Sequence, residues 1–408
     1  MNLNTGSWAS PLLQLVARLR SDGLNSATPV TEINGGTISA TNADIALVAK
    51  GTGATLAQVP DGTTVGGNKR GTGATDWQKV RNAVTQVAGG ASSVIAGGSN
   101  NTTSGLASVV GGGQNNSAIN ANATVIGGYN NTASGSGSVC GGFINTASSN
   151  YSFVGGGDYN IAQTNTHAAV CGGSSNTAGG QYSFVGGGQL GSASNTCAAV
   201  VGGSLNTSSG GNAFIGAGYN NAASSPQSTV CGGIYNTANG VDSFVAGGRR
   251  GTTRAIWGNH VFPACSAPIA ETTGITQSAL LLLARQTTDA TATVLTSNTS
   301  AAFTNNQVIL PNNAAYYFRG SVIAGVTAGG NSKAWTFEGA IKRGANAAST
   351  AIVGTVVLNT IAQDAGASSW AVAITADTTN GGIAVTVTGA ASTTIRWVAK
   401  IETTEMTY

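Results

Sequence analysis

A short glycine-containing motif recurs through the middle of this chain at an almost constant spacing. The last glycine of each Gly-Gly or similar pair recurs at steps of 15, 15, 14, 15, 16, 15, 15, 15, 15 and 15 residues, at Gly98, Gly113, Gly128, Gly142, Gly157, Gly173, Gly188, Gly203, Gly218, Gly233 and Gly248. A short internal repeat indicates a solenoid, in which each unit packs against its neighbours in the sequence. These glycines therefore mark eleven repeat units.

The composition of the repeat favours strands and tight turns over helix. The units are rich in Gly, Asn, Ser, Thr and Val, whereas a helical repeat would need Ala, Leu, Glu and Lys. Fifteen residues suffice for two short strands and two turns, which is one coil of a β-solenoid. We predict an all-β fold in which residues 91–251 form a parallel β-solenoid, or β-roll, of roughly 50 Å at the strand spacing of roughly 4.8 Å.

Three positions before each anchor glycine stands a β-branched residue. Stacked at the strand spacing, these residues form a continuous apolar ladder. We predict that this ladder lines the inside of the solenoid, and its members are Ile95, Val110, Val125, Val139, Val154, Val170, Val185, Val200, Ile215, Val230 and Val245.

The positions flanking this ladder point to the other side of the strand, because strand side chains alternate. They are largely apolar, and large residues in one coil lie beside small ones in the next. A strand with two apolar faces is normally buried on both, yet one solenoid has a single interior. We therefore expect sister chains to cover this face in a cyclic homotrimer, with an interface formed by Phe153, Phe184, Phe214, Phe244, Cys140, Cys171 and Cys231.

Three positions after the anchor glycine, most units carry asparagine. Gly191 and Gly251 occupy this position in the other two units. Asn and Gly both tolerate left-handed backbone, and stacked Asn side chains can hydrogen-bond along a ladder. We predict that these residues form a corner of each coil: Asn101, Asn116, Asn131, Asn145, Asn160, Asn176, Asn206, Asn221 and Asn236.

The pattern changes after residue 251. Residues 252–269 are expected to be a linker, and residues 270–408 show the alternation of ordinary strands. The candidate strands are 278–286, 291–296, 307–310, 315–325, 334–343, 349–358, 369–376, 382–388 and 393–403. They predict an antiparallel β-sandwich, of which a jelly roll is one form. Tyr316, Tyr317 and Phe318 could offer a stacking surface for a sugar, although core packing is the more common role of such residues.

Charge and cysteine usage argue against several classes of function. Charged residues make up only 8% of the 408 residues and the net charge is +3, so we expect no nucleic-acid partner. The chain has five cysteines and two histidines without a CxxC motif or a Cys/His cluster, so we expect no metal and no cofactor. The first residues lack the basic and apolar regions of a signal peptide, so we expect synthesis in a cytoplasm and no membrane insertion.

The repeat units read SFVGGGxYNxA at Ser152–Ala162 and VCGGxxNTA from Val170. They resemble the head repeats of trimeric autotransporter adhesins and, more closely, the repeats of phage tail-fibre proteins. Residues 49–63 and the run TTIRWVAKIE at Thr393–Glu402 resemble the segments that flank such repeats in phage proteins. The resemblance covers most of residues 45–408 and implies a trimeric β-roll in a virion fibre. Units of 15 rather than 14 residues imply a different coil cross-section.

This resemblance gives the two N-terminal segments an expected role. Residues 1–27 are expected to contain a short helix over residues 10–22, and residues 28–90 a β-rich neck with Gly-rich turns. The helix would carry one apolar stripe, formed by Leu12, Leu15, Val16 and Leu19. We interpret this stripe as an anchor to the virion, with simple packing on the shaft as the alternative.

The resemblance implies a structural virion fibre or spike, synthesised in the host cytoplasm and without enzymatic activity. Its N-terminal region would bind other virion proteins, and its C-terminal domain would bind a host-surface glycan or another receptor. A capsid-decorating head fibre without a receptor role and a glycan-cleaving tailspike are the alternatives. Glycosidases need two carboxylates about 5 to 10 Å apart, whereas Asp158 and Asp242 lie six coils apart and the C-terminal domain shows no recognisable pair. An ice-binding solenoid would not explain the C-terminal domain.

Overall fold

The computed structural model describes residues 53–136, 138–263 and 266–408. The chain divides into two compact units, Met1–Val48 and Ala49–Tyr408, and every described residue belongs to the second unit. The predicted N-terminal helix, with Leu12, Leu15, Val16 and Leu19, lies outside the described residues.

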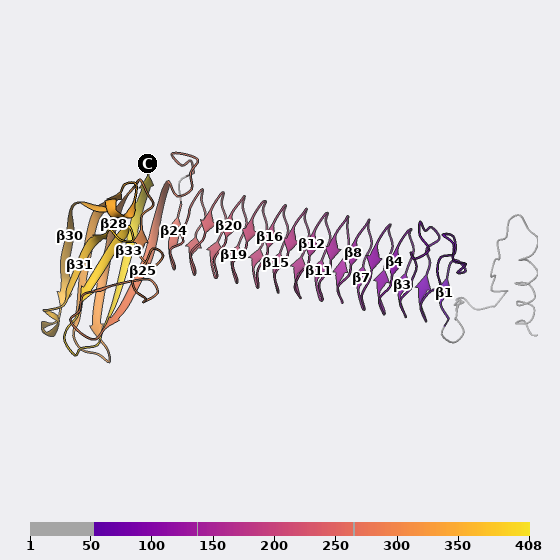
Figure 1. Ribbon diagram of the computed structural model, residues 1–408, viewed down its shortest axis with the longest axis horizontal. Helices are drawn as coiled ribbons and strands as arrows, with labels where there is room; N and C mark the ends of the chain where they lie inside the picture. Colours follow the sequence, from indigo (N-terminus) through magenta and orange to yellow (C-terminus); the bar gives the residue numbers. More distant parts are fainter. Residues whose placement is uncertain (1–52, 137, 264–265) are drawn as a thin grey trace, which may run out of the picture. The chain divides into compact units, whose positions relative to one another are not determined.

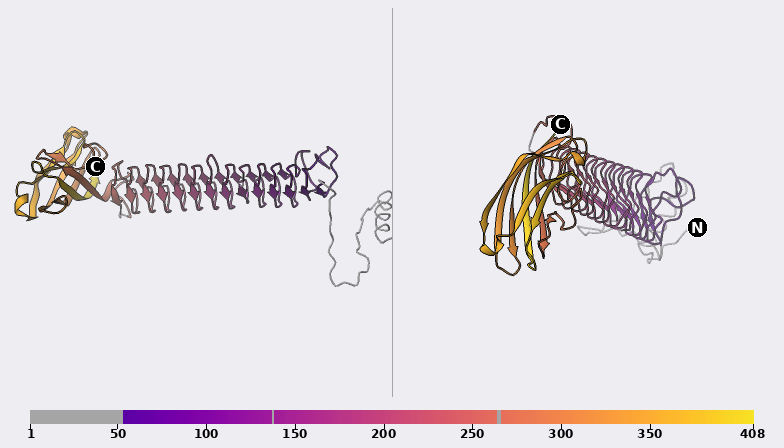
Figure 2. Two further views of the ribbon diagram at one scale, coloured as in Figure 1. Left: turned by 90° about the horizontal axis from the view of Figure 1, so that it is seen from below. Right: turned by 60° about the vertical axis from the view of Figure 1, so that its left-hand side comes forward.

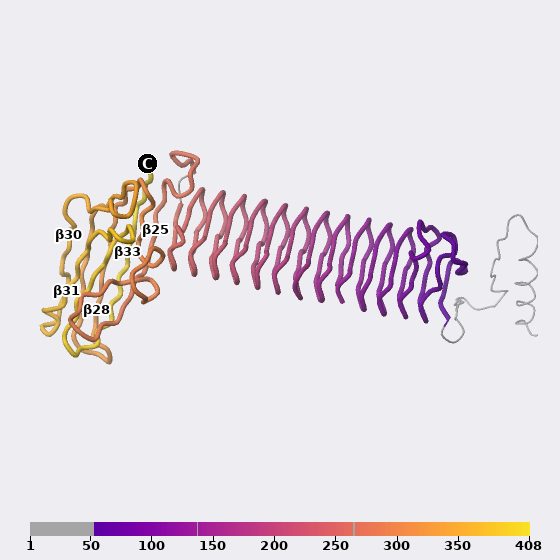
Figure 3. Tube along the Cα trace, viewed as in Figure 1, coloured from indigo at the N-terminus to yellow at the C-terminus, as the bar shows by residue number. Residues whose placement is uncertain are grey.

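The first part of the described chain is a parallel β-solenoid of about 12 coils (Figure 1). A regular coil contains two strands of two residues each, joined by sharp bends that are clear in the Cα trace (Figure 3). Neighbouring coils pair in parallel and in register, so that Phe184 lies opposite Ala199 and Val185 lies opposite Val200. The repeat in the sequence is therefore the repeat of the coils.

The coils build two parallel β-sheets. The first contains β1 (Thr55–Leu56), β2 (Thr75–Asp76), β3 (Val94–Ile95), β5 (Val109–Val110), β7 (Thr124–Val125), β9 (Val139–Cys140), β11 (Phe153–Val154), β13 (Ala169–Val170), β15 (Phe184–Val185), β17 (Ala199–Val200), β19 (Phe214–Ile215), β21 (Thr229–Val230), β23 (Phe244–Val245) and β24 (His260–Phe262). The second has ten strands: β4 (Thr102–Thr103), β6 (Ser117–Ala118), β8 (Thr132–Ala133), β10 (Thr146–Ala147), β12 (Ile161–Ala162), β14 (Thr177–Ala178), β16 (Ser192–Ala193), β18 (Thr207–Ser208), β20 (Ala222–Ala223) and β22 (Thr237–Ala238).

The solenoid extends beyond the predicted shaft at both ends. Strands β1 and β2 lie in the predicted neck and pair in parallel with the shaft, in a register that aligns Thr55, Thr75 and Val94. Strand β24 lies in the predicted linker and pairs in parallel with β23. The two N-terminal coils contain 20 and 19 residues, as these aligned positions show, and the sequence periodicity does not reach them because they are longer than the repeat.

The solenoid interior is narrow because a row of branched residues faces a row of very small ones. The second residue of each regular strand points inward, and in the first sheet this row is mostly Val or Ile. Facing it, the second sheet contributes Thr103, Ala118, Ala133, Ala147, Ala162, Ala178, Ala193, Ser208, Ala223 and Ala238, all fully buried. Each two-residue strand thus places one side chain inside the solenoid and one outside it.

Ten members of the predicted Val/Ile ladder are fully buried, but Val139 is not part of it. In that coil Cys140 pairs with Val125 and is fully buried, whereas Val139 points outward and is half-buried. The predictions for Val139 as core and for Cys140 as interface were therefore wrong. This coil is one residue shorter between the strand and its anchor glycine, so counting back from Gly142 selects the residue before the ladder.

The asparagine ladder stabilises one corner from the inside. All nine predicted asparagines are buried. Asn116 is typical: its Nδ2 donates to the carbonyls of Gly112 and Gly128, each at 2.9 Å, and its Oδ1 accepts the N–H of Asn131 at 3.0 Å. Each such side chain joins its own coil to the next one, and its oxygen satisfies a buried backbone N–H that would cost about 1 to 3 kcal/mol if left unpaired.

The left-handed backbone falls on other residues than the asparagines of the ladder. The residue before each of them has a positive φ, as at Asn115 (φ 59) and Tyr159 (φ 55), and so does the anchor glycine, as at Gly113 (φ 81). A Cβ on Gly113 would lie 2.1 Å from the carbonyl oxygen of Gly128, so only glycine fits there. The expected hydrogen bonds along the ladder are thus confirmed, whereas the expected left-handed backbone at the ladder asparagines was wrong.

The C-terminal part forms two antiparallel sheets around one apolar core (Figure 2). In the larger sheet β25 (Thr276–Thr287), β33 (Ile395–Thr407), β28 (Ala314–Val326), β29 (Ser332–Arg343) and β30 (Ala351–Gln363) pair in this order, and β24 pairs with β25. In the smaller sheet β32 (Gly382–Thr388) pairs with β31 (Ala371–Asp377), β26 (Thr293–Val294) and β27 (Val308–Ile309). Two short 3-10 helices, η1 (Ala347–Ser349) and η2 (Ala365–Ala367), flank β30, and each of the nine predicted strands overlaps an observed one.

Candidate interaction surfaces

One outer side of the solenoid is apolar along the regular coils. We call this side the outer face. It consists of the outward side chains of the first sheet and the side chain of the residue that follows each strand of that sheet. Phe153, Phe184 and Phe214 are 41%, 38% and 39% exposed, Phe244 is half-buried, and Cys171 and Cys231 are exposed. Val94, Val109, Ile126 and Val201 extend the same face. Apart from Cys140, the residues predicted for the interface thus lie on one face.

The outward positions of the second sheet have a different composition. Thr or Ser occupies most of them: Thr102, Ser117, Thr132, Thr146, Thr177, Ser192, Thr207 and Thr237. Both sheets have the same strand length and the same coil period, so the contrast lies in the side chains alone. Hydroxyl groups are readily solvated, whereas a long apolar stripe is not. The outer face is therefore the candidate interaction surface of the solenoid.

Aromatic rings stack along two corners of the solenoid. Tyr129 and Phe143 stack with ring centroids 5.3 Å apart, and Tyr159 meets Phe143 edge-on at 5.6 Å. On another corner His167 stacks between Tyr151 and Tyr182, at 5.1 and 5.0 Å. The stacking of coils brings these rings together. Aligning the units on their anchor glycines would have revealed the stack of Tyr151, His167 and Tyr182 and the pair Tyr129 and Phe143, but not Tyr159, which stands one position further from its glycine.

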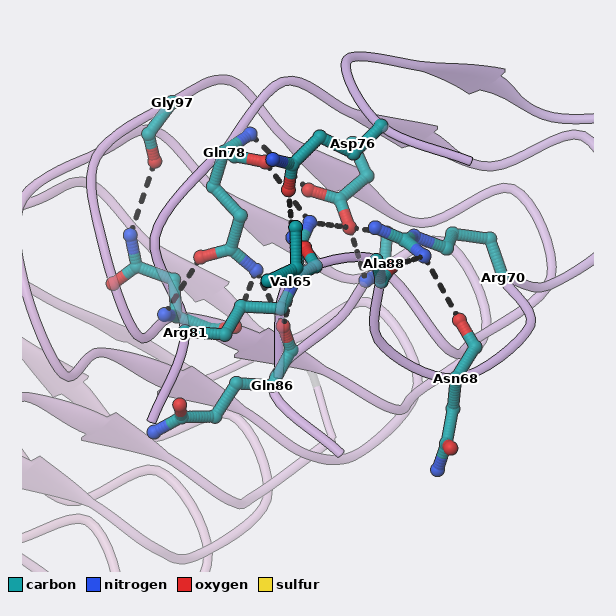
Figure 4. Close-up of polar contacts among 12 residues, drawn as sticks. Val65, Asn68, Arg70, Asp76, Gln78, Arg81, Gln86, Ala88 and Gly97 are labelled. Atoms are coloured by element: carbon teal, nitrogen blue, oxygen red, sulfur yellow. Dashed lines mark hydrogen bonds and ion pairs between the residues drawn. The ribbon is translucent and has the colours of Figure 1, made fainter. Parts of the chain in front are cut away.

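A buried ion cluster closes the N-terminal end of the regular coils (Figure 4). The Asp76 carboxylate Oδ2 lies 2.8 Å from Nε of Arg70 and 3.1 Å from Nη2 of Arg81, and the three side chains are at most 1% exposed. Gln78 begins the asparagine ladder: its Oε1 accepts the N–H of Asn101 at 2.9 Å and its Nε2 donates to the Asn101 carbonyl at 2.9 Å. Apart from the buried Nη2 of Arg70, which has no hydrogen-bond partner, these groups bond within the chain, so the cluster is an end cap of the core.

A hollow of about 430 Å³ lies on the outer side of the larger C-terminal sheet. Polar side chains from four adjacent strands line it: Lys400 and Glu402 from β33, Arg319 and Ser321 from β28, Thr336 and Glu338 from β29, and Asn359 from β30. Glu338 and Glu402 both pair in register with Arg319, from opposite sides, so two strand spacings of about 4.8 Å separate them. The structure therefore brings together two carboxylates that showed no pairing in the sequence.

The electrostatics of this pair differ from those of a glycosidase acid and base. Lys400 and Arg319, both hydrogen-bonded to the Glu402 carboxylate, lower the pKa of Glu402. Glu338 is exposed and accepts the Tyr317 hydroxyl at 3.0 Å, and this hydrogen bond raises the pKa of Tyr317. A catalytic acid needs a carboxyl group whose pKa is raised by burial, and neither glutamate is buried. The hollow is built as an ion-paired, solvent-open surface.

The three aromatic residues proposed for sugar stacking have different positions. Tyr316 and Phe318 are buried in the domain core at 1% and 0% exposure, and only Tyr317 is exposed, at 45%. Alternation along β28 puts Tyr317 on the outer side. Two of the three proposed stacking residues are therefore core residues.

Strand β30 is exposed on both of its sides over almost its whole length. It has 13 residues without a charge, and Val353, Val357, Leu358 and Ile361 are between 38% and 62% exposed. Among the described strands the only one that pairs with it is β29, so its outer edge has no partner in this part of the chain. A long uncharged edge strand of this kind offers unpaired backbone groups and apolar side chains to another chain.

The described residues contain no group of three or more His, Cys, Asp or Glu side chains that could hold a metal ion. Among these same residues there is no helix with the length and hydropathy of a membrane span.

Comparisons with known proteins do not assign this chain to a family. No protein-family model and no curated protein matches the chain. One solved structure that resembles it is the crystal structure of the Acinetobacter phage vB_ApiP_P1 tailspike protein, with 11% sequence identity over 87% of this chain and 80% of that chain. The TM-score is 0.23, so this likeness carries no argument about fold or function.

Proposed function

We propose that this chain is a structural virion fibre or spike protein of a phage, whose solenoid forms a trimeric shaft and whose C-terminal domain binds a host-surface glycan. The observation that carries the proposal is the asymmetry of the solenoid. Its outer face is apolar with Phe153, Phe184 and Phe214 exposed, whereas the outward side of the second sheet is Thr- and Ser-rich. A shaft of several chains buries the first and leaves the second in water.

Trimer formation accounts for how the outer face is covered. Its large and small residues come in alternate coils, since Phe153, Phe184 and Phe214 pair with Ala169, Ala199 and Thr229. Around a threefold axis, three copies at the same height place layers of phenylalanine between layers of small residues, as a packed core requires. The exposed strand β30 in the C-terminal domain supplies a second apolar surface for sister chains.

The C-terminal domain is proposed to bind rather than to cleave. In its outward hollow Glu402 is ion-paired and half-buried and Glu338 is exposed, so no carboxyl group there is buried enough to act as a catalytic acid. The repeat resemblance to phage fibre proteins supports a place in the virion, with attachment to other virion proteins through the N-terminal region.

Immunogold electron microscopy tests the virion assignment. Antibodies against residues 270–408 are applied to particles from a lysate in which this chain is expressed. We expect gold at the free ends of projecting fibres or spikes. Particles without label, from a lysate in which the chain is detected outside the particles, would overturn the assignment.

A reducing-end assay separates binding from cleavage. The purified full chain is incubated with host capsular or surface polysaccharide, and we expect retention on the polysaccharide without release of new reducing ends. Turnover that is lost in Glu338→Gln or Glu402→Gln, and kept in a control variant Asp289→Asn outside the hollow, would make the chain an enzyme and contradict the binding role.

A further inference from the structure

A second hollow, of about 520 Å³, lies where the last solenoid coil meets the C-terminal domain. Its walls are Thr252 and Arg254 from the end of the solenoid, and Thr304, Ile309, Leu310, Pro311, Arg343, Ala347, Thr379 and Asn380 from the C-terminal domain. This volume is in the range of small-molecule sites, in which a few polar groups fix the orientation of the ligand. Hydroxyl, amide and guanidinium groups thus share the hollow with apolar side chains.

Arg343 is fixed in this hollow by backbone rather than by an acid. Its Nη1 donates to the carbonyl of Leu310 at 2.6 Å and, more weakly, to the carbonyl of Gly381 at 3.5 Å. A Cβ on Gly381 would lie 2.3 Å from Nη1, so the absence of a side chain at Gly381 makes room for the guanidinium. The Arg343 side chain is therefore held in place before any ligand binds.

The charge of Arg343 is not compensated. In the described part of the chain, no Asp or Glu carboxylate lies within ion-pair distance of Arg343, and its buried Nε has no hydrogen-bond partner. Arg254, the other cation of the hollow, is neutralised by Glu405, whose Oε2 lies 3.2 Å from its Nε. Asp377 lies beside the hollow, where its carboxylate accepts the side-chain N–H of Asn380 at 2.8 Å, so the distinguishing feature of the hollow is the unpaired Arg343 and not its net charge. A buried unpaired N–H group such as that of Arg343 is costly until an acceptor reaches it.

The two arginines lie near one buried hydroxyl group. Burial and the charge of Glu405 raise the pKa of Tyr316 well above its usual value, while the charges of Arg254 and Arg343 both act to lower it. Arg254 and Arg343 are therefore both close enough to the hydroxyl of Tyr316, in β28, to affect its pKa. By contrast, both cations of the hollow on the outer side of the larger sheet, Arg319 and Lys400, are paired with the Glu402 carboxylate.

We propose that this second hollow binds the carboxylate of an acidic sugar unit, with Arg343 as the anion-binding residue. A guanidinium fork matches a carboxylate in shape and charge. The hydroxyls of Thr252, Thr304 and Thr379 fit the ring hydroxyls, as does the amide oxygen of Asn380, whose Nδ2 donates to Asp377. Ile309 and Pro311 fit the apolar sides of the ring. The inference rests on the proposed glycan-binding role and names its substrate class: a saccharide that contains uronic acid.

Calorimetric titration of the full chain with glucuronate tests the site, with glucose and inorganic phosphate as comparison ligands. We expect saturable glucuronate binding with a Kd of about 1 mM, weaker binding of glucose, and no comparable binding of phosphate. Arg343→Ala should weaken glucuronate binding by about tenfold or more, because it removes a charge-assisted contact. Arg319→Ala, in the outer hollow, is the matched control and should leave it unchanged.

Because Arg343 also holds two loops, Asn380→Ala serves as a milder variant, and the melting curve of each variant reports its folding. A folded Asn380→Ala protein should bind glucuronate more weakly than the unaltered chain. Equal binding of glucuronate and phosphate, no saturation with glucuronate, or equal loss in Arg319→Ala would overturn the proposal. If glucuronate fails to bind while the chain still adheres to host cells, the site assignment is wrong and the attachment role stands; if adhesion is also absent, the attachment role fails.

Discussion

At the scale of single residues, the four described cysteines occupy three kinds of position in this solenoid. Cys140 has a ladder position in the core, and burial raises the pKa of its thiol to about 12. Cys171 and Cys231 are exposed on the outer face, and Cys197 is exposed at a corner, where its φ is 54°. These positions make the thiols internal reporters of what is covered.

Alkylation of the native full chain at pH 8 should therefore sort the thiols into three classes. Cys140 should stay unmodified, because the thiolate is the reactive form and a pKa of about 12 leaves almost none of it. Cys197 should react quickly. Cys171 and Cys231 should be protected by sister chains until the oligomer is dissociated. Peptide mass spectrometry gives the extent of each reaction, and the denatured chain, in which all of them react, is the control.

Equal rates for Cys171, Cys231 and Cys197 in the native protein would show that the outer face is open to solvent. That result would remove the main support for a face covered by sister chains.

At the scale of elements, the asparagine ladder joins neighbouring coils. Asn160 donates to the carbonyls of Gly156 and Gly173 at 2.9 and 2.8 Å, and its Oδ1 accepts the N–H of Asn176 at 3.0 Å. With strands of only two residues, the sheets alone supply few hydrogen bonds per coil. The side-chain ladder therefore fixes the turn that precedes each strand of the second sheet.

Replacing Asn160 with alanine should lower the free energy of unfolding by about 2 kcal/mol, because the buried Asn176 N–H and the partly buried Gly156 carbonyl lose their partner. The Gly173 carbonyl keeps a second donor, the Asp158 N–H at 3.0 Å. Asn165→Ala, in the same coil, is the control: Asn165 is exposed and donates one bond, to the Gly179 carbonyl at 3.3 Å, so its loss should cost less than about 0.5 kcal/mol. Urea unfolding followed by circular dichroism measures both. Equal, small effects would mean that the ladder does not hold the coils together.

The coils and the C-terminal strands could be predicted from the sequence, with one coil misaligned, whereas the two hollows could not. Eleven glycines at a regular spacing defined the coils, and alternation along single strands located the C-terminal ones. The coil with Cys140 was misaligned because its missing residue lies between the ladder and the glycine used for counting. The two hollows could not be predicted, because contacts between segments far apart in the sequence, such as the pairing of β28 with β33 in the outer hollow, bring their residues together.

At the scale of the whole molecule, two apolar surfaces have no cover within the described part of the chain. One is the outer face of the solenoid, and the other is strand β30 of the C-terminal domain. A monomer with both surfaces open would aggregate, whereas a closed cyclic oligomer buries them and stops growing. The proposed fibre therefore requires a closed oligomer in which sister chains bury both surfaces.

Sedimentation equilibrium of the full chain at micromolar concentration tests this claim directly. For a cyclic trimer we expect a single species with three times the chain mass of 40.0 kDa. The double variant Phe184→Asp and Phe214→Asp should dissociate or aggregate, because it places charges on the outer face. The matched control is Thr207→Asp, an exposed position on the polar second sheet, which should leave the trimer intact. A stable, soluble 40.0 kDa monomer would contradict the account.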